Sequence, residues 1–286
     1  KYRERMEDLV LRHPRIFGEY KKGSVRFDDF GVRRAGNRIV DEWGCVWTFL
    51  VDGLQGQVVE HPLEDWKALE TYKPPDPLAL ENLPKEGFPP SPGDFKEALR
   101  ELEKNKREGK LAVGSCPHGF MFQRLYYLRG FNNLMRDFIT EPPQLKTLIR
   151  MVVEFNLKII RRWLEVGIDL LSVGDDLGTQ DRLPIPPSKF RKFLFPAYKE
   201  MFTPVRERGV HIHFHSDGHI MEIVDDLIEA GVTIINLQDL VNGVETIKKR
   251  LKGRVCVDVD IDRQRIVPFG RPSEVERHVK HVISEL

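Results

Sequence analysis

Predicted strands and helices alternate without interruption from Leu111 to the end of the chain. Short apolar or alternating runs predict strands at 111–116, 169–174, 211–217, 233–237 and 255–261, with helix-like segments between them. Strands that are joined through helices are parallel and are connected by right-handed crossovers. The pattern therefore leaves two architectures, a closed (β/α)8 barrel and an open doubly wound sheet.

Polar residues at the strand ends favour the barrel. No glycine-rich phosphate-binding loop follows any of these strands, which weakens the case for an open nucleotide-binding sheet. Polar side chains instead follow several strands, namely Cys116, His118, Asp175, Asp176, His215, Asp217, Gln238, Asp239, Asp260 and Asp262. Catalytic groups supplied by many strand ends are typical of a barrel. We therefore expect an α/β fold with a (β/α)8 (TIM) barrel body at residues 93–286.

The strand at 211–217 carries the strongest functional signal. Side chains alternate faces along a strand, so the odd-numbered residues from His211 to Asp217 point the same way. Imidazoles on a core-facing stripe would each need a buried hydrogen-bond partner. At the end of a barrel strand, His215 and Asp217 can instead offer a nitrogen and an oxygen to one metal ion. We expect these two residues to be metal ligands, with His213 in hydrogen-bonding support. A purely structural role for this stretch is the alternative.

Other strand-end and turn residues are further site candidates. The candidates for catalysis are Asp175, Asp176 and Asp262. The candidates for substrate binding are His118, Phe120, Phe122 and Gln180. Each type has a plain structural alternative, because aspartates commonly cap turns and clustered aromatic residues usually belong to a core.

Composition excludes several classes of protein. Apolar residues make up 41% of the 286 residues and charged residues 31%, with a formal net charge of +1. This balance provides no electrostatic footprint for nucleic acid or a membrane surface, and no run is long enough to span a bilayer. The three cysteines form no paired motif, so we expect no disulfides and a cytoplasmic location. The last predicted helix stops at Leu286, so we expect a truncated C-terminal end.

The first 92 residues are less regular. They contain a predicted helix at 2–13, strands at 24–30 and 38–51 that include a tryptophan-rich hairpin, and proline-rich stretches at 73–77 and 88–92. We expect residues 1–92 to form an extension that packs on the barrel, giving a single structural domain overall.

Several motifs resemble one known superfamily. They are Asp41-Glu42-Trp43-Gly44, His61-Pro62-Leu63-Glu64-Asp65-Trp66, the segment 174–180, His215-Ser216-Asp217-Gly218 and the run from Asp225 to Asn236. Together they make nearly the whole chain resemble the uroporphyrinogen decarboxylase superfamily, and most closely its corrinoid-linked methyltransferase branch. The resemblance implies a (β/α)8 barrel. In thiol-methylating members, a His-x-Cys-Gly motif and a later cysteine hold zinc. Here His215 matches the histidine and Asp217 stands in place of the cysteine.

The resemblance implies a methyltransferase that moves a methyl group between a small methylated compound and methylcobamide carried by a corrinoid protein. Carboxylate in place of thiolate makes bound zinc harder, which suits an ether oxygen, so we expect zinc-assisted O-demethylation. The arginine-rich motif and the Phe-Ser-Asp segment of the decarboxylases are absent, so we expect no uroporphyrinogen decarboxylation.

Two other functions stay open. One is a metal-free acid–base enzyme acting through Asp175, Asp176 and His215, and the other is a non-catalytic barrel that binds a small molecule. A homodimer is also left open.

Overall fold

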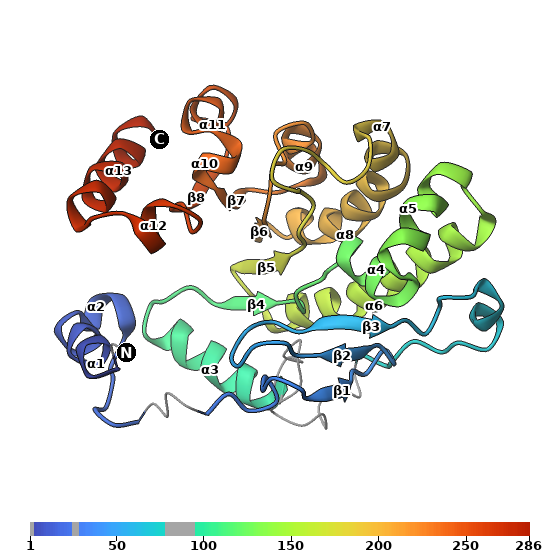
Figure 1. Cartoon of the computed structure of the whole chain (residues 1–286), viewed down its shortest axis with the longest axis horizontal. Helices are drawn as coiled ribbons and strands as arrows, with labels where there is room; N and C mark the ends of the chain where they lie inside the picture. The colour runs from blue at the N-terminus through green and yellow to red at the C-terminus, as the bar shows by residue number, and fades with distance from the viewer. Residues whose placement is uncertain (1–2, 25–28, 78–94) are drawn as a thin grey trace. The chain divides into compact units, whose positions relative to one another are not determined.

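The computed structural model of the chain describes residues 3–24, 29–77 and 95–286 (Figure 1). The protein divides into two compact units. The smaller unit is Lys1–Ile39 with Val46–Val59, and the larger unit is Val40–Cys45 with Glu60–Leu286. The boundary that the sequence predicts at residue 92 lies outside the described residues.

The smaller unit combines two short helices with strands of a small sheet. The helices are α1 (Arg3–Arg12) and α2 (Pro14–Phe17). The strands are β1 (Arg38–Val40), β2 (Val46–Thr48) and β3 (Gln57–Glu60), and they pair in that order. Trp47 and Phe49 are buried, as expected of a tryptophan-rich hairpin. The strand predicted at 24–30 lies largely outside the described residues.

The larger unit alternates strands and helices as the sequence predicts. Its strands are β4 (Val113–Ser115), β5 (Leu170–Gly174), β6 (His211–Ser216), β7 (Ile234–Gln238) and β8 (Cys256–Asp260). Its longer helices are α3 (Phe95–Arg107), α4 (Phe122–Arg129), α5 (Phe131–Thr140), α6 (Pro143–Val166), α8 (Phe195–Glu207), α9 (Val224–Ala230), α11 (Val244–Leu251) and α13 (Pro272–Glu285). Shorter helical turns are η1 (Trp66–Glu70), α7 (Pro187–Lys189), η3 (Phe190–Leu194), α10 (Asp239–Asn242) and α12 (Ile266–Phe269). Helix α4 was not predicted.

The five strands of the larger unit form one parallel sheet in the order β4-β5-β6-β7-β8. Each strand therefore lies beside its neighbours in the chain, as in a barrel. A doubly wound sheet instead reverses its strand order at a switch point. The described residues of the larger unit contribute five strands, which pair in one sheet. This sequential order of parallel strands is that of the barrel-type fold, which the polar residues at the strand ends predict.

The register brings polar residues of neighbouring strands level with one another. Gly174 of β5 lies opposite His215 of β6, which lies opposite Asn236 of β7. Asn236 in turn lies opposite Asp258 of β8. Because all the strands are parallel, their C-terminal ends meet at one edge of the sheet. The structure thus places Asp175 and His215 at the same edge, where the Asp175 amide donates to the His215 carbonyl at 3.0 Å.

Helices with one apolar face pack against this sheet. Helix α6 begins with Pro143, whose missing N–H costs nothing in a first turn, and ends at Gly167 in a left-handed conformation. Its buried residues include Leu148, Val152 and Ile160. Helix α8 contacts β6, α6 and α9. No helix in the described part of the chain is both long and apolar enough to cross a membrane.

The loops that follow β5 and β6 contact each other through two glycines. The Gly178 amide donates to the Asp217 carbonyl at 3.2 Å, and the His219 amide donates to the Thr179 carbonyl at 2.7 Å. A Cβ on Gly178 would lie 2.4 Å from the His219 nitrogen, and one on Gly218 would lie 2.2 Å from the Gly178 carbonyl carbon. Only glycine at both positions permits this approach.

We predict that Gly218→Ala destabilises the protein more than Gly209→Ala. Both glycines have a positive φ, 82° and 74°, but a Cβ on Gly209 meets nothing within 4 Å. Gly209→Ala therefore costs only backbone strain of about 1–2 kcal/mol. Gly218→Ala adds a backbone clash, for an expected total of about 3 kcal/mol or more. Urea unfolding measures both values, and equal losses would contradict the contact.

Candidate functional site

The carboxylate of Asp175 is buried at the end of β5 and points into the protein. It accepts hydrogen bonds from the amides of Met121, Phe122 and Gln123 at 2.9, 2.6 and 2.9 Å. It also accepts one from the Tyr198 hydroxyl of α8. Burial raises the pKa of Asp175 to about 6, although these hydrogen bonds act in the opposite direction. Asp175 therefore joins β5 to the start of α4 and to α8.

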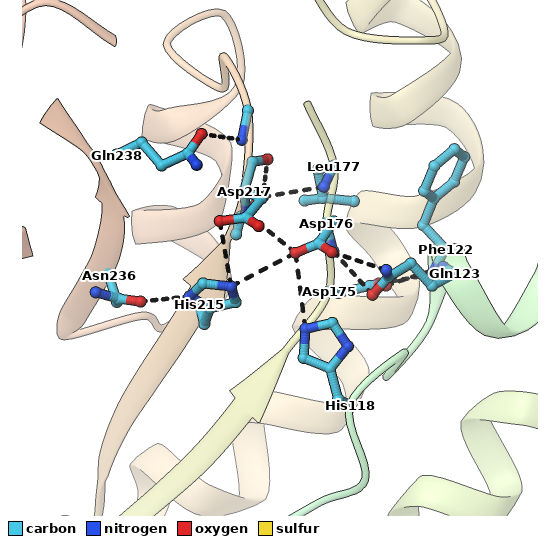
Figure 2. Close-up of polar contacts among 12 residues, drawn as sticks. His118, Phe122, Gln123, Asp175, Asp176, Leu177, His215, Asp217, Asn236 and Gln238 are labelled. Atoms are coloured by element: carbon cyan, nitrogen blue, oxygen red, sulfur yellow. Dashed lines mark hydrogen bonds and ion pairs between the residues drawn. The ribbon is translucent and has the colours of Figure 1, made fainter. Parts of the chain in front are cut away.

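The next residue, Asp176, points the other way, into a cluster of imidazoles and carboxylates (Figure 2). Its Oδ1 lies 3.7 Å from His118 Nε2 and 3.5 Å from His215 Nε2. The same oxygen accepts from the Asp217 amide at 3.1 Å. Its Oδ2 accepts from Gln123 Nε2 at 2.8 Å, and Gln123 Oε1 accepts from the Asp176 amide at 3.1 Å. Gln123 thus fixes the orientation of this carboxylate.

The charges in the cluster reinforce one another. Burial lowers the pKa of His118, but the carboxylates of Asp176, Asp175 and Asp217 outweigh it and raise that pKa overall. Burial likewise raises the pKa of Asp176, but the neighbouring His118 outweighs it and the pKa is lowered. The cluster therefore stabilises Asp176 as a carboxylate.

The tautomer of His215 follows from its neighbours. The amide nitrogen of Asn236 donates to the Asp258 carbonyl at 3.0 Å and to Asp260 Oδ1 at 3.1 Å. The amide oxygen of Asn236 therefore accepts, and it contacts His215 Nδ1. In neutral His215 the proton consequently sits on Nδ1, which leaves the lone pair of Nε2 facing the carboxylates of Asp176 and Asp217.

A second set of carboxylates lies on the other side of His215. Asp217 Oδ1 is 3.6 Å from His215 Nε2, and Arg263 donates to the same oxygen. Arg263 also lies 3.8 Å from Asp260 Oδ2. Two groups of residues therefore have donor atoms within 4.8 Å of one another, one made of His118, Asp176 and His215 and the other of His215, Asp217 and Asp260. Either group could hold a metal ion.

His213 lies deeper in β6 than His215 and contacts a different partner. Its Nε2 lies 3.0 Å from Asp258 Oδ2, and its buried Nδ1 has no hydrogen-bond partner. The residue that contacts the ring of His215 is Asn236. Asn236 of β7, and not His213, is therefore the residue that supports the ring of His215.

Several other candidates lie away from the cluster. Phe120 and Phe122 are 1% and 2% exposed, so both belong to the core and do not line an open pocket. Phe120 stacks on Phe202 with ring centroids 5.8 Å apart. Gln180 is exposed. Asp262 is buried and accepts from the amides of residues 264, 265 and 266 at 3.2, 2.9 and 2.8 Å, so it caps the turn that leads into α12.

Sequence reasoning missed three residues of the cluster, Gln123, Asn236 and Arg263, and it noted Asp260 at a strand end without choosing it as a site residue. Asp260 carries the same strand-end signal as its neighbours, and Asn236 is a polar residue in an apolar strand that is level with His215. Gln123 and Arg263 lie in a helix and a loop without any local signal. They join the cluster only through contacts with residues 53 and 46 positions away along the chain.

A parallel sheet whose strand ends converge on such a cluster defines an α/β barrel-type protein with a candidate ligand site at the C-terminal edge. Residues 48–286 match the family model described as uroporphyrinogen decarboxylase (URO-D). The chain therefore belongs to the uroporphyrinogen decarboxylase family. This confirms the resemblance seen in the sequence.

One solved structure shares this fold. The structure is similar to that of a methyltransferase from Methanosarcina mazei, with a TM-score of 0.65 and 17% identity over 99% of this chain and 76% of that one. A dihydropteroate synthase from Xanthomonas albilineans with 4-aminobenzoic acid matches 46% of this chain and 47% of its own, with 19% identity and a TM-score of 0.31. No curated protein sequence matches the chain.

We predict that Asp175→Asn destabilises the protein by about 2–4 kcal/mol. An asparagine would turn an amide group toward buried N–H donors and leave at least one of them without an acceptor, which costs about 1–3 kcal/mol per group. Asp176→Asn is the matched control. It alters a carboxylate that is partly exposed and lies next to two imidazoles, so it should cost less than Asp175→Asn. Thermal and urea unfolding measure both, and a stable Asp175→Asn variant would contradict the structural role.

Proposed function

We propose that this protein is a methyltransferase that moves a methyl group from a small methyl ether to a corrinoid carried by a partner protein, with the help of zinc. The observation that carries the proposal is the cluster around His215, where imidazole nitrogens and carboxylate oxygens converge within 4.8 Å. Membership of the family and the fold shared with a methyltransferase support it.

The donor atoms of the cluster fit a zinc ion. Zinc binds neutral imidazole nitrogen and carboxylate oxygen, and the contact of Asn236 with His215 Nδ1 leaves Nε2 as the ligand atom that faces the carboxylates. His215 and Asp217, the two ligands that the sequence predicts, both lie in the cluster. When bound there, zinc would supply Lewis-acid stabilisation of the charge that develops on an ether oxygen.

The residues of the cluster suit the demands of ether cleavage. The bond between methyl carbon and oxygen breaks, the methyl group passes to the corrinoid cobalt, and the oxygen leaves with the electron pair and takes up a proton. His118 is more than one-third exposed, so this side of the cluster is open to solvent, from which the leaving oxygen can take up its proton. Asp176, which Gln123 orients, lies beside that imidazole and holds it in place.

Decarboxylation of a polycarboxylate suits this cluster poorly. Asp176, Asp217 and Asp260 present negative charge to any bound molecule. In the described part of the chain, Arg263 is the arginine that pairs with these carboxylates, and it is already engaged by Asp217 and Asp260. A substrate with several carboxylates would meet like charges that no free guanidinium balances.

An acid–base enzyme that needs no metal is the second candidate. The pairing of Asp176 with two imidazoles favours it, because such pairs also transfer protons in metal-free sites. Removal of metal separates the two functions. The methyltransferase loses its activity on dialysis against a chelator and recovers it with zinc, whereas the acid–base enzyme retains full activity.

We predict that His215→Ala abolishes both zinc binding and methyl transfer. Asn236→Ala should lower zinc affinity by about 10–100-fold, because it removes the partner that orients His215, and His213→Ala should have a smaller effect. The measurements are zinc content and formation of methylcobalamin from free cob(I)alamin and a panel of methyl ethers. His211→Ala is the control, since His211 lies exposed at the opposite end of β6. Stoichiometric zinc and full transfer in His215→Ala would contradict the proposal.

We also predict that the purified protein forms no coproporphyrinogen from uroporphyrinogen. The reason is the excess of carboxylates in the cluster and their prior pairing with Arg263. The assay is chromatography of the oxidised porphyrins after incubation under reducing conditions. If the tetracarboxylate product forms in stoichiometric amounts, the protein is a decarboxylase and the proposal of methyl transfer is wrong.

A further inference from the structure

We propose that the metal ion is bound by His118, Asp176 and His215, and that Asp217 stays paired with Arg263 instead of serving as a ligand. The inference rests on the proposed metal-assisted function and deepens it by naming the ligand set. It replaces the His-x-Asp pair that the sequence predicts with a set drawn from three strand ends, those of β4, β5 and β6 (Figure 2).

The distances within this set match those around one ion. Asp176 Oδ1 lies 3.5 Å from His215 Nε2 and 3.7 Å from His118 Nε2. Bonds of about 2.0–2.2 Å in a tetrahedral arrangement place the ligand atoms about 3.3–3.6 Å apart. Two imidazoles and one carboxylate also leave a fourth position for substrate, as in catalytic zinc sites. The set therefore needs little movement to close on an ion.

Each of the three side chains is held by a residue outside the set. Asn236 orients His215, and Gln123 orients Asp176 through two hydrogen bonds of 2.8 and 3.1 Å. The ring of His118 lies over Gly174, where an added Cβ would be 2.6 Å from His118 Cδ2. The amides of Gly119 and Phe120 donate to the Gly174 carbonyl at 3.0 and 3.1 Å, which fixes the turn that carries His118. Supports of this kind are typical of preorganised metal sites.

The competing set is already neutralised by protein groups. Asp217 Oδ1, the oxygen nearest His215, accepts from Arg263. Asp260 accepts from Asn236 at 3.1 Å and lies 3.8 Å from Arg263. An ion bound here would have to displace a guanidinium of its own charge sign. Among the described residues, the ion pairs of Asp176 involve histidines alone, so no such displacement is needed.

Zinc affinities of matched variants test this ligand set. The protein is stripped of metal with a chelator, and zinc binding is measured by competition with a chromophoric indicator. His118→Ala and Asp176→Asn should each weaken binding by more than about 100-fold, beyond the range typical of supporting residues. Asp217→Asn and Asp260→Asn should stay within about tenfold of the unmodified protein. His211→Ala should not change the affinity.

Folding of each variant is checked by circular dichroism and urea unfolding, and His118→Gln replaces His118→Ala if the latter does not fold. The proposal is overturned if Asp217→Asn or Asp260→Asn loses zinc while His118→Ala and Asp176→Asn retain it. It is also overturned if the unmodified protein binds no zinc.

The outcome is independent of the methyl-transfer assay. If Asp217→Asn or Asp260→Asn loses zinc while His118→Ala and Asp176→Asn retain it, and the unmodified protein transfers methyl groups, the ligand set is rejected and the proposed function stands. If zinc is bound by the proposed ligands but no methyl transfer occurs, the proposed function is rejected and the ligand set stands.

Discussion

The buried carboxylate of Asp175 is the interaction on which the site depends. It lies at the N-terminus of α4, where three amides and the positive end of the helix dipole offset the cost of its burial. Tyr198 of α8 completes its hydrogen bonds. Asp175 points inward, and Asp176, the next residue, points toward the imidazoles of His118 and His215 (Figure 2). The contact between Asp175 and the Gln123 amide places Gln123 beside Asp176, so the buried carboxylate of Asp175 helps to position the partly exposed carboxylate of Asp176.

The geometry of the cluster follows from two further constraints. The glycine contact between the loops after β5 and β6 brings Asp217 against Asp176, and the strand register brings Asn236 level with His215. The three carboxylates of Asp176, Asp217 and Asp260 then face one guanidinium, which leaves an excess of negative charge while the imidazoles are neutral. A divalent cation would balance that excess. The charge of the site thus fits a metal better than it fits an anionic substrate.

The alternation of strands and helices was enough to predict the parallel sheet, and the polar strand ends favoured the sequential strand order of a barrel and indicated the edge at which the site lies. The His215 stretch was recognisable because three imidazoles on one strand face make a poor core. The different roles of Asp175 and Asp176 were not predictable, since the two residues are adjacent and chemically identical. What separates them is helix α4, whose short apolar sequence gave no clear helical period. Phe120 and Phe122 were predicted to bind substrate, but the structure buries them in the core. The sequence alone does not distinguish an aromatic residue that lines a site from one that packs in a core.

Other members of the cluster could not be predicted because their contacts cross the sheet or join distant loops. Arg263 follows Asp262 in a loop, and only the folded chain brings it to Asp217.

The most direct test of the proposed metal site is a crystal structure of the zinc-loaded protein with anomalous diffraction at the zinc absorption edge. The account predicts one peak, about 2.0–2.2 Å from ligand atoms of His118, Asp176 and His215. Its absence, or a peak bound by Asp217 and Asp260 with Arg263 displaced, would contradict it.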